Sequence, residues 1–112
     1  MKLFVAGISY KTAPVALREK VAVHPSLLAC TGCRLKLGAR LEEVVLLSTC
    51  NRVEIYGTTP QVNGNVHGIL RHLGAGETDY SSALYIKEGD EAVKHLFQVA
   101  GGLDSMVVGE TE

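Results

Sequence analysis

The chain has 112 residues, of which 46% are hydrophobic and 21% are charged, so it is long enough to bury a core of its own as one globular domain, residues 1–112. Eleven basic and 12 acidic residues leave a formal net charge of −1, which excludes a global basic field that would draw the domain to nucleic acid or to a membrane surface. The sequence has no signal segment and no run of about 18 apolar residues, so we expect neither secretion nor a membrane span. Its three cysteines, an odd number, fit a reducing cytoplasm better than a disulfide scaffold, so we expect a cytoplasmic protein.

The first half of the chain predicts one strand followed by two helices. Residues 3–8 are apolar on both faces, which is typical of a central strand, and Gly7 within it would permit a close approach by a neighbouring strand. A short helix is expected over residues 15–21, just after Pro14. Ser26 is the expected N-cap of a longer helix that ends at about Arg40. Its predicted apolar stripe consists of Leu27, Cys30, Leu37 and Leu41, flanked by Leu28 and Leu35.

Within that longer helix, Cys30 and Cys33 form a C-x-x-C pair, which in other settings ligates zinc or acts as a redox couple. A structural zinc site needs four ligands, and no second pair of cysteines or histidines at ligand spacing follows. The redox motif opens a helix after a strand, whereas this pair falls inside a helix. We therefore expect no bound metal and treat the two cysteines as ordinary helix residues.

The centre of the chain predicts a hairpin that carries a cysteine in its turn. Residues 44–47 indicate a strand buried on both faces, and residues 53–56 alternate like a half-buried strand. Cys50 lies in the turn, and the positive charge of Arg52 is the kind of neighbour that thiolate chemistry needs. Side chains alternate along a strand, so Cys50, Arg52, Glu54 and Tyr56 can share one face. By spacing alone, the simpler interpretation is a small buried cysteine at a strand end, with Arg52 and Glu54 as solvated charges.

The second half predicts a helix, a strand and a further helix. The helix begins at Thr59 and Pro60, and its apolar residues recur at helical spacing: Val62, Val66, Ile69, Leu70 and Leu73. A strand follows over residues 82–87, and Asp90 can cap a helix over residues 91–100 whose predicted core stripe is Val93, Leu96, Phe97 and Ala100. His95 points away from that stripe, so we expect it to be either exposed to solvent or part of a site. The last ten residues carry no stop signal, which predicts that the natural chain continues.

The order of elements predicts the fold class. A β-α-β-β-α-β series of this size indicates an α+β, ferredoxin-like arrangement, an antiparallel sheet with helices on one face. RNA-recognition modules share that arrangement, but they place stacking aromatics on the central strands, where this hairpin offers only Tyr56. The fold alone decides no function.

Three blocks of the sequence together resemble the glutamyl-tRNA reductase family. The blocks are residues 7–15 with Arg18 and Glu19, residues 48–56, and residues 102–110. Their order and separation are similar to those in the N-terminal catalytic domain of that family. The resemblance implies that the NADPH-binding and dimerisation domains of such enzymes lie outside these 112 residues. Two positions depart from the family pattern: Tyr10, where histidine is more common, and Glu112, where glutamine is expected.

The resemblance also implies a chemistry and a set of site residues. Cys50 would attack the activated ester of glutamyl-tRNA to form an enzyme thioester, which NADPH would reduce to glutamate-1-semialdehyde, a precursor of tetrapyrroles. His95 matches a histidine near the nucleophile. The substrate-binding residues would be Thr49, Asn51, Arg52, Ser105, Glu110, Thr111 and Glu112. Arg52, with its planar fork, would bind the substrate carboxylate.

The implied partners are glutamyl-tRNA, a second copy of the full-length enzyme in a homodimer, and the next enzyme of the pathway, a glutamate-semialdehyde aminomutase. Two other classes of function stay open on the sequence. One is a metal- or redox-binding module that uses Cys30 and Cys33. The other is a non-catalytic RNA-binding module of the same fold, which would not depend on Cys50.

Overall fold

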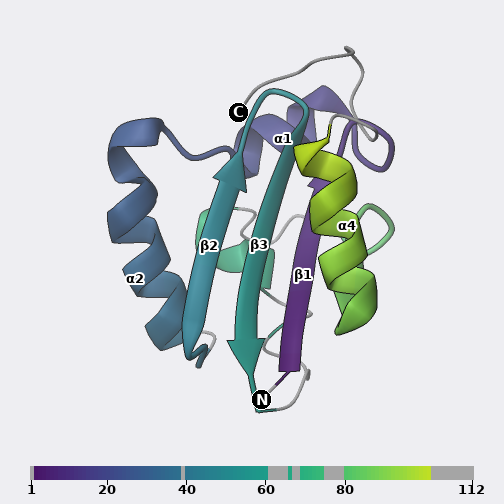
Figure 1. Ribbon diagram of the computed structural model, residues 1–112. Helices are drawn as coiled ribbons and strands as arrows, with labels where there is room; N and C mark the ends of the chain where they lie inside the picture. Colours follow the sequence, from purple (N-terminus) through teal and green to yellow (C-terminus); the bar gives the residue numbers. More distant parts are fainter. Residues whose placement is uncertain (1, 39, 61–65, 67–68, 75–79, 102–112) are drawn as a thin grey trace.

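The computed structural model describes residues 2–38, 40–60, 66, 69–74 and 80–101. Four strands form one antiparallel sheet in the order β2-β3-β1-β4, which confirms the α+β class and the central place of the first strand (Figure 1). The strands are β1 (Lys2–Ser9), β2 (Glu43–Ser48), β3 (Arg52–Thr59) and β4 (Tyr85–Glu88). β4 is shorter than the predicted strand and begins three residues later.

The burial of the two strands of the central hairpin is the reverse of what the sequence predicts. β2 lies at the edge of the sheet, and Val45 within it is 64% exposed, so the expectation of a strand buried on both faces is wrong. β3 lies between β2 and β1, and its residues are buried on both faces rather than on one. The polar residues of β3 look solvent-facing in sequence, but they are covered because other elements pack over them.

One face of the sheet carries the main hydrophobic core. It is covered by α1 (Val15–Val21) and the 3₁₀ helix η2 (Ile69–Leu73), while α2 (Leu28–Gly38) packs beside β2 (Figure 1). The largest fully buried members of this core are Phe4, Ile8, Leu35, Ile55, Ile69 and Leu70. Val66 is also buried in it, whereas Val62 lies outside the described residues.

The second helix differs from the prediction in where it begins and in which of its residues are buried. A 3₁₀ turn, η1 (Pro25–Leu27), precedes α2, and it is His24 that accepts a hydrogen bond from the Ser26 backbone, at 3.1 Å. The buried residues of α2 are Thr31 and Leu35, while Cys30 and Leu37 of the predicted stripe are exposed. Because the helix lies along the edge strand, only a narrow side of it is covered.

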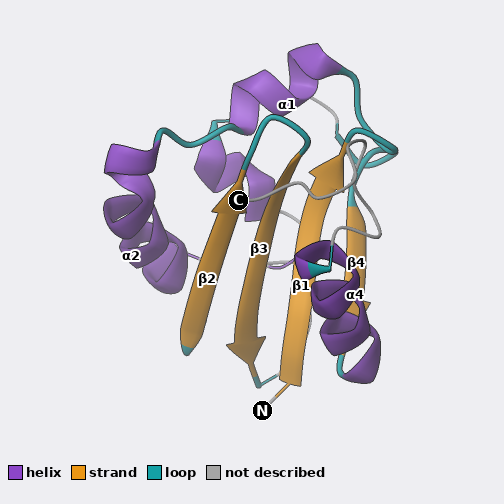
Figure 2. Ribbon diagram, turned by 45° about the horizontal axis from the view of Figure 1, so that its top comes forward, coloured by secondary structure: helices purple, strands orange, loops and turns teal. Residues whose placement is uncertain are grey.

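The other face of the sheet is covered by α4 (Asp90–Ala100), which lies over β1 in both views (Figures 1 and 2). Ala92 of this helix packs against Val5 and Tyr56, whose positions along their strands turn them away from the main core. The expectation of helices on one face is therefore wrong. Apolar side chains on both faces of β1 require cover on both sides, and α4 supplies the second layer.

The orientation of α4 about its own axis also differs from the prediction. Its buried residues are Ala92, His95 and Val99, whereas Leu96 is 43% exposed and Phe97 is 70% exposed. The apolar stripe read from the sequence is thus the outer face of the helix. A buried histidine needs a polar partner, and that partner, Glu54, lies on the sheet 41 residues earlier in the chain, so helical periodicity cannot reveal it.

No helix formed by the described residues is long and apolar enough to cross a membrane.

Candidate active site

The loop of residues 49–51 holds Cys50 at the end of the sheet where β2 turns into β3. Thr49 stabilises this loop with its own side chain, because its hydroxyl accepts hydrogen bonds from the backbone amides of Asn51 at 3.2 Å and of Arg52 at 3.3 Å. The Thr49 amide in turn donates to the Arg52 carbonyl at 2.8 Å. The loop is therefore closed at its base, and Cys50 at its tip is exposed.

Two neighbouring segments fix the carbonyl groups of this loop. The Tyr10 amide donates to the Asn51 carbonyl at 2.7 Å, and the Arg18 guanidinium donates to the Cys50 carbonyl at 2.6 Å. Arg18 also donates to the Ala13 carbonyl at 3.3 Å, so it connects the start of α1 to the cysteine loop. The Cys50 backbone is held while its side chain is accessible, which is the arrangement that a nucleophilic thiol requires.

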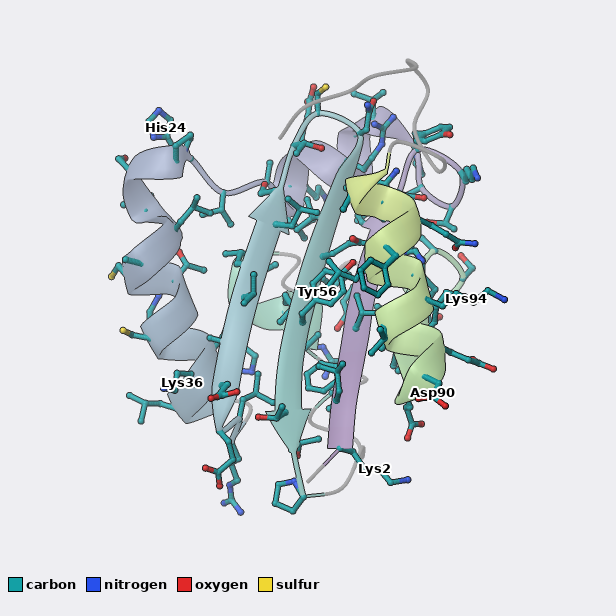
Figure 3. The ribbon with its side chains drawn as sticks, viewed as in Figure 1. Lys2, His24, Lys36, Tyr56, Asp90 and Lys94 are labelled. Atoms are coloured by element: carbon teal, nitrogen blue, oxygen red, sulfur yellow. The ribbon has the colours of Figure 1, made fainter. Side chains whose placement is uncertain are left out.

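Arg52 and Glu54 follow the loop on β3 and are both fully buried, so the alternative of two solvated charges is wrong. One Arg52 nitrogen, Nη1, lies 3.9 Å from Glu54 Oε2. Both residues share the face of β3 that α4 covers, together with Tyr56, which lies on that face in Figure 3. The predicted common face of these three residues is confirmed, whereas Cys50 lies in the exposed loop before the strand.

The Glu54 carboxylate is the point at which the polar groups of this face meet. Tyr56 donates to its Oε1 at 2.9 Å, Tyr85 donates to its Oε2 at 2.5 Å, and His95 Nε2 contacts the same Oε2. Burial raises the pKa of Glu54, but the hydrogen bonds from His95, Tyr85 and Tyr56 and the charge of His95 outweigh it, so the pKa lies below the ordinary value. Burial and the neighbouring carboxylate raise the pKa of Tyr85, which therefore keeps its proton.

His95 is buried against the sheet and is one of the residues that line a surface pocket. The volume of this pocket is about 250 Å³, and its lining consists of Ser9, Lys11, Thr12, Tyr85, Lys87, His95 and Gln98. Ser9 pairs with Arg52 across β1 and β3, so the pocket begins beside the base of the cysteine loop. The C-terminal end of α4 lies toward the same end of the sheet (Figure 1).

The structure connects His95 to the strand that follows the cysteine loop, through Glu54 on β3. Cys50 precedes Glu54, the partner of His95, by four residues, which spans at most about 14 Å along an extended chain. Hydrogen bonds hold this loop against Tyr10 and Arg18 as well as closing it on itself.

The predicted substrate-binding residues divide into two groups. Thr49, Asn51 and Arg52 surround Cys50 in the hairpin. The other four lie outside the described residues: Ser105, Glu110, Thr111 and Glu112.

Sequence reasoning assigned no role to Arg18, Glu54 or Tyr85. Arg18 and Glu54 belong to the sequence blocks that resemble the family, and that resemblance is a signal by which they could be found. Tyr85 carried no signal, because only the pairing of β4 with β1 brings it to this face.

The C-x-x-C pair lies inside α2, as predicted, with both sulfurs free and exposed. Among the described residues, no group of three or more histidine, cysteine, aspartate or glutamate side chains is placed to hold a metal ion.

Comparisons with known proteins point to one family. Residues 6–112 match the family described as "Glutamyl-tRNAGlu reductase, N-terminal domain". A glutamyl-tRNA reductase of Desulfitobacterium hafniense is 46% identical over 95% of this chain and 25% of its own length. One of Bacillus pumilus is 44% identical over 100% of this chain and 26% of its own length. Among solved structures, the glutamyl-tRNA reductase from Methanopyrus kandleri aligns with a TM-score of 0.74 at 32% identity, over 96% of this chain and 24% of that chain. The chain thus spans about a quarter of the length of these relatives.

Proposed function

The chain belongs to the glutamyl-tRNA reductase family, and from that premise we propose that it is the part of the enzyme that reacts with glutamyl-tRNA. The observation that carries the proposal is the exposed Cys50 at the tip of a loop whose carbonyl groups are fixed by Arg18 and Tyr10. A held backbone with an accessible thiol suits a nucleophile better than a packing residue.

In the proposed reaction, the Cys50 thiolate attacks the ester carbonyl that joins glutamate to the tRNA ribose. A carbon–sulfur bond forms, the carbon–oxygen bond to the ribose breaks, and the ribose oxygen leaves with a proton, so that free tRNA and a glutamyl thioester result. Thr49 and Asn51 shape the loop around the reacting centre. Ser105, Glu110, Thr111 and Glu112 complete the proposed substrate pocket.

Arg52 and His95 have separate proposed roles. Arg52 is fully buried at the base of the loop, where its guanidinium would bind the side-chain carboxylate of the glutamyl group. His95 would act as the proton-transferring group, because its imidazole is among the groups that line the pocket beside the cysteine loop.

The residues present do not fit NADPH, the reductant implied by the family. A dinucleotide fold needs a glycine-rich turn from a strand into a helix. Among the described residues, the connection from β1 to α1, residues 10–14, contains no glycine, and the connection from β4 to α4 is the single residue Gly89, which is too short for a G-x-G-x-x-G turn. We therefore assign to this chain the formation of the thioester only. Its reduction to glutamate-1-semialdehyde, for tetrapyrrole synthesis, belongs in the proposal to other parts of the longer enzyme.

The proposal extends to fold and partners. We infer a ferredoxin-like arrangement with α4 as an additional helix, supported by the strand order β2-β3-β1-β4. The proposed setting is a cytoplasmic homodimer of the full-length enzyme, with NADPH-binding and dimerisation domains beyond this one. A glutamate-semialdehyde aminomutase, which consumes the reactive aldehyde, is the proposed partner in the pathway.

The test is mass spectrometry of the chain after incubation with glutamyl-tRNA. We expect a glutamyl adduct on Cys50 that is absent in Cys50→Ser, because a serine hydroxyl is a far weaker nucleophile at neutral pH. The matched control is Cys30→Ser with Cys33→Ser, which removes two exposed thiols and should leave the adduct unchanged. An adduct on Cys50→Ser at the native rate would refute the assignment.

A further inference from the structure

Glu54 has no role in the proposed reaction, although its carboxylate lies at the centre of the face that carries Arg52 and His95. It is fully buried, and ionised carboxylates in such positions are retained only where several groups compensate the lost hydration. The number of groups that converge on it suggests a function in holding them rather than in packing.

The two carboxylate oxygens have different partners. Oε1 accepts a hydrogen bond from Tyr56, which lies two residues later on the same strand. Oε2 accepts from Tyr85 on β4 and contacts His95 on α4, and the Arg52 guanidinium lies 3.9 Å from it. A single oxygen atom thus joins two proposed site residues to a tyrosine from another strand.

The protonation states follow from this geometry. An ionised carboxylate can only accept hydrogen bonds, so His95 must donate from Nε2 and Tyr85 from its hydroxyl. This leaves Nδ1 as the ring nitrogen of His95 that can accept a proton or a hydrogen bond. The Tyr85 ring further restrains the imidazole, because their centroids lie 5.3 Å apart with an interplanar angle of 54°.

Gly7 makes the contact between Glu54 and Tyr85 possible. In the sheet register, Gly7 pairs with Glu54 on one side and with Tyr85 on the other, so all three residues lie in one row on the same face. The backbones of β3 and β4 are about 10 Å apart across β1, and the two side chains meet above the position that has no side chain. A Cβ atom at Gly7 would lie 2.9 Å from Glu54 Cγ and 2.6 Å from the Val53 carbonyl oxygen.

We propose that Tyr85 is a positioning residue for His95 that acts through the Glu54 carboxylate, which it reaches over Gly7. The hydroxyl of Tyr85 holds Oε2 in place, Oε2 fixes the imidazole with Nε2 protonated, and Nδ1 is the nitrogen presented to the substrate. This inference rests on the proposed function for His95, since a fixed tautomer matters only if that imidazole transfers a proton.

The first measurement reports the tautomer without any activity. Long-range ¹H–¹⁵N spectra of the imidazoles show which ring nitrogen carries the proton, and the signal of His95 among four histidines is identified by its loss in His95→Gln. We expect protonated Nε2 in the native chain and a mixture of tautomers in Tyr85→Phe. The matched control is Tyr80→Phe, since Tyr80 is also buried but lies in the core on the opposite face, and its spectrum should be native.

The second measurement is the rate of adduct formation on Cys50 as a function of the concentration of glutamyl-tRNA. Proton transfer by a positioned side chain contributes about 10²–10⁴-fold, so partial loss of positioning in Tyr85→Phe should slow the reaction by about tenfold at saturating substrate. The substrate concentration for half-maximal rate should stay the same, and Tyr80→Phe should react at the native rate.

The outcomes separate the two claims. A native chain that forms no adduct refutes the proposed function, and the tautomer spectra still decide whether Tyr85 fixes the ring. If the native chain reacts but Tyr85→Phe keeps both the native tautomer and the native rate, the positioning role is wrong. Equal changes in Tyr85→Phe and Tyr80→Phe would also overturn it, because they would indicate a general loss of packing.

Discussion

Glu54 and Arg52 place two charges in the interior of a small sheet, where the loss of hydration costs several kcal/mol per ion. The cost is offset because the carboxylate is hydrogen-bonded by two tyrosines and a histidine as well as lying near the guanidinium. Such a cluster stabilises the fold only while every member is present, since removing one leaves its partners unsatisfied. The same residues that serve the proposed chemistry therefore also affect the stability of the domain.

The lowered pKa of Glu54 predicts how stability depends on pH. Burial raises this pKa, but the hydrogen bonds and the His95 charge bring it below the ordinary value of 4.5, so the folded state binds fewer protons at this group than the unfolded chain does. The stabilisation is thus present above pH 4.5 and is lost as the pH falls through the lowered pKa. Glu54→Gln should reduce the free energy of unfolding at neutral pH by about 2 kcal/mol, and its difference from the native chain should shrink in acid.

Urea unfolding followed by circular dichroism at several pH values measures this difference. Glu43→Gln is the matched control, because Glu43 is an exposed residue at the start of the edge strand and its substitution should change little at any pH. A difference between Glu54→Gln and the native chain that stays constant down to strongly acidic pH would contradict the ionised state of Glu54.

At the scale of the elements, α4 shows how an amphipathic pattern can mislead. The helix has a strong apolar side, yet that side faces outward, and the side with His95 faces the sheet. The polar residue is buried because Glu54 and Tyr85 supply its partners, and Ala92 is small enough to lie close to Val5 and Tyr56. The position of the helix is therefore set by one polar contact and by small residues rather than by its largest apolar side chains.

Two substitutions on α4 distinguish the observed orientation from the one predicted by periodicity. Phe97→Ala removes a ring that is 70% exposed and should change the free energy of unfolding by no more than about 0.5 kcal/mol. Val99→Ala removes two buried methyl groups and should cost about 2 kcal/mol. Thermal or urea unfolding of the two variants side by side decides the question. A cost for Phe97→Ala of about 3–5 kcal/mol, the usual value for a core phenylalanine, would mean that the helix is turned the other way.

The sequence predicted the elements better than it predicted their burial. The apolar run of β1 was correctly read as a central strand, and the position of Cys50 in a turn was correct because strand and turn signals are local. The edge position of β2, the second layer formed by α4 and the burial of His95 all depend on contacts between distant segments. Tyr85 entered the site for the same reason, since β4 meets β1 only in the folded sheet.

At the scale of the whole molecule, the two faces of the sheet have different compositions. Within the part of the chain that the structure describes, one face carries the large apolar core with α1 and η2, while the other buries a small apolar cluster around Val5 beside the polar groups of Arg52, Glu54 and His95. Most of the hydrophobic stabilisation therefore comes from the face away from the candidate site. The polar face can hold buried charges because it does not have to provide the core.

The proposal that this chain forms the thioester but does not reduce it leads to a prediction about NADPH. The 112 residues contain no G-x-G-x-x-G after a strand, and Gly101 follows the end of α4 instead of opening a helix, so we expect this chain alone not to oxidise NADPH. A thioester formed on Cys50 would then be released only by water or another nucleophile, which gives slow hydrolysis of glutamyl-tRNA at a rate that added NADPH leaves unchanged. The assay follows NADPH absorbance and the release of glutamate in parallel, with Cys50→Ser as the control that should show neither. Oxidation of NADPH that requires both glutamyl-tRNA and this chain would contradict the prediction, because it would require a dinucleotide site within these residues.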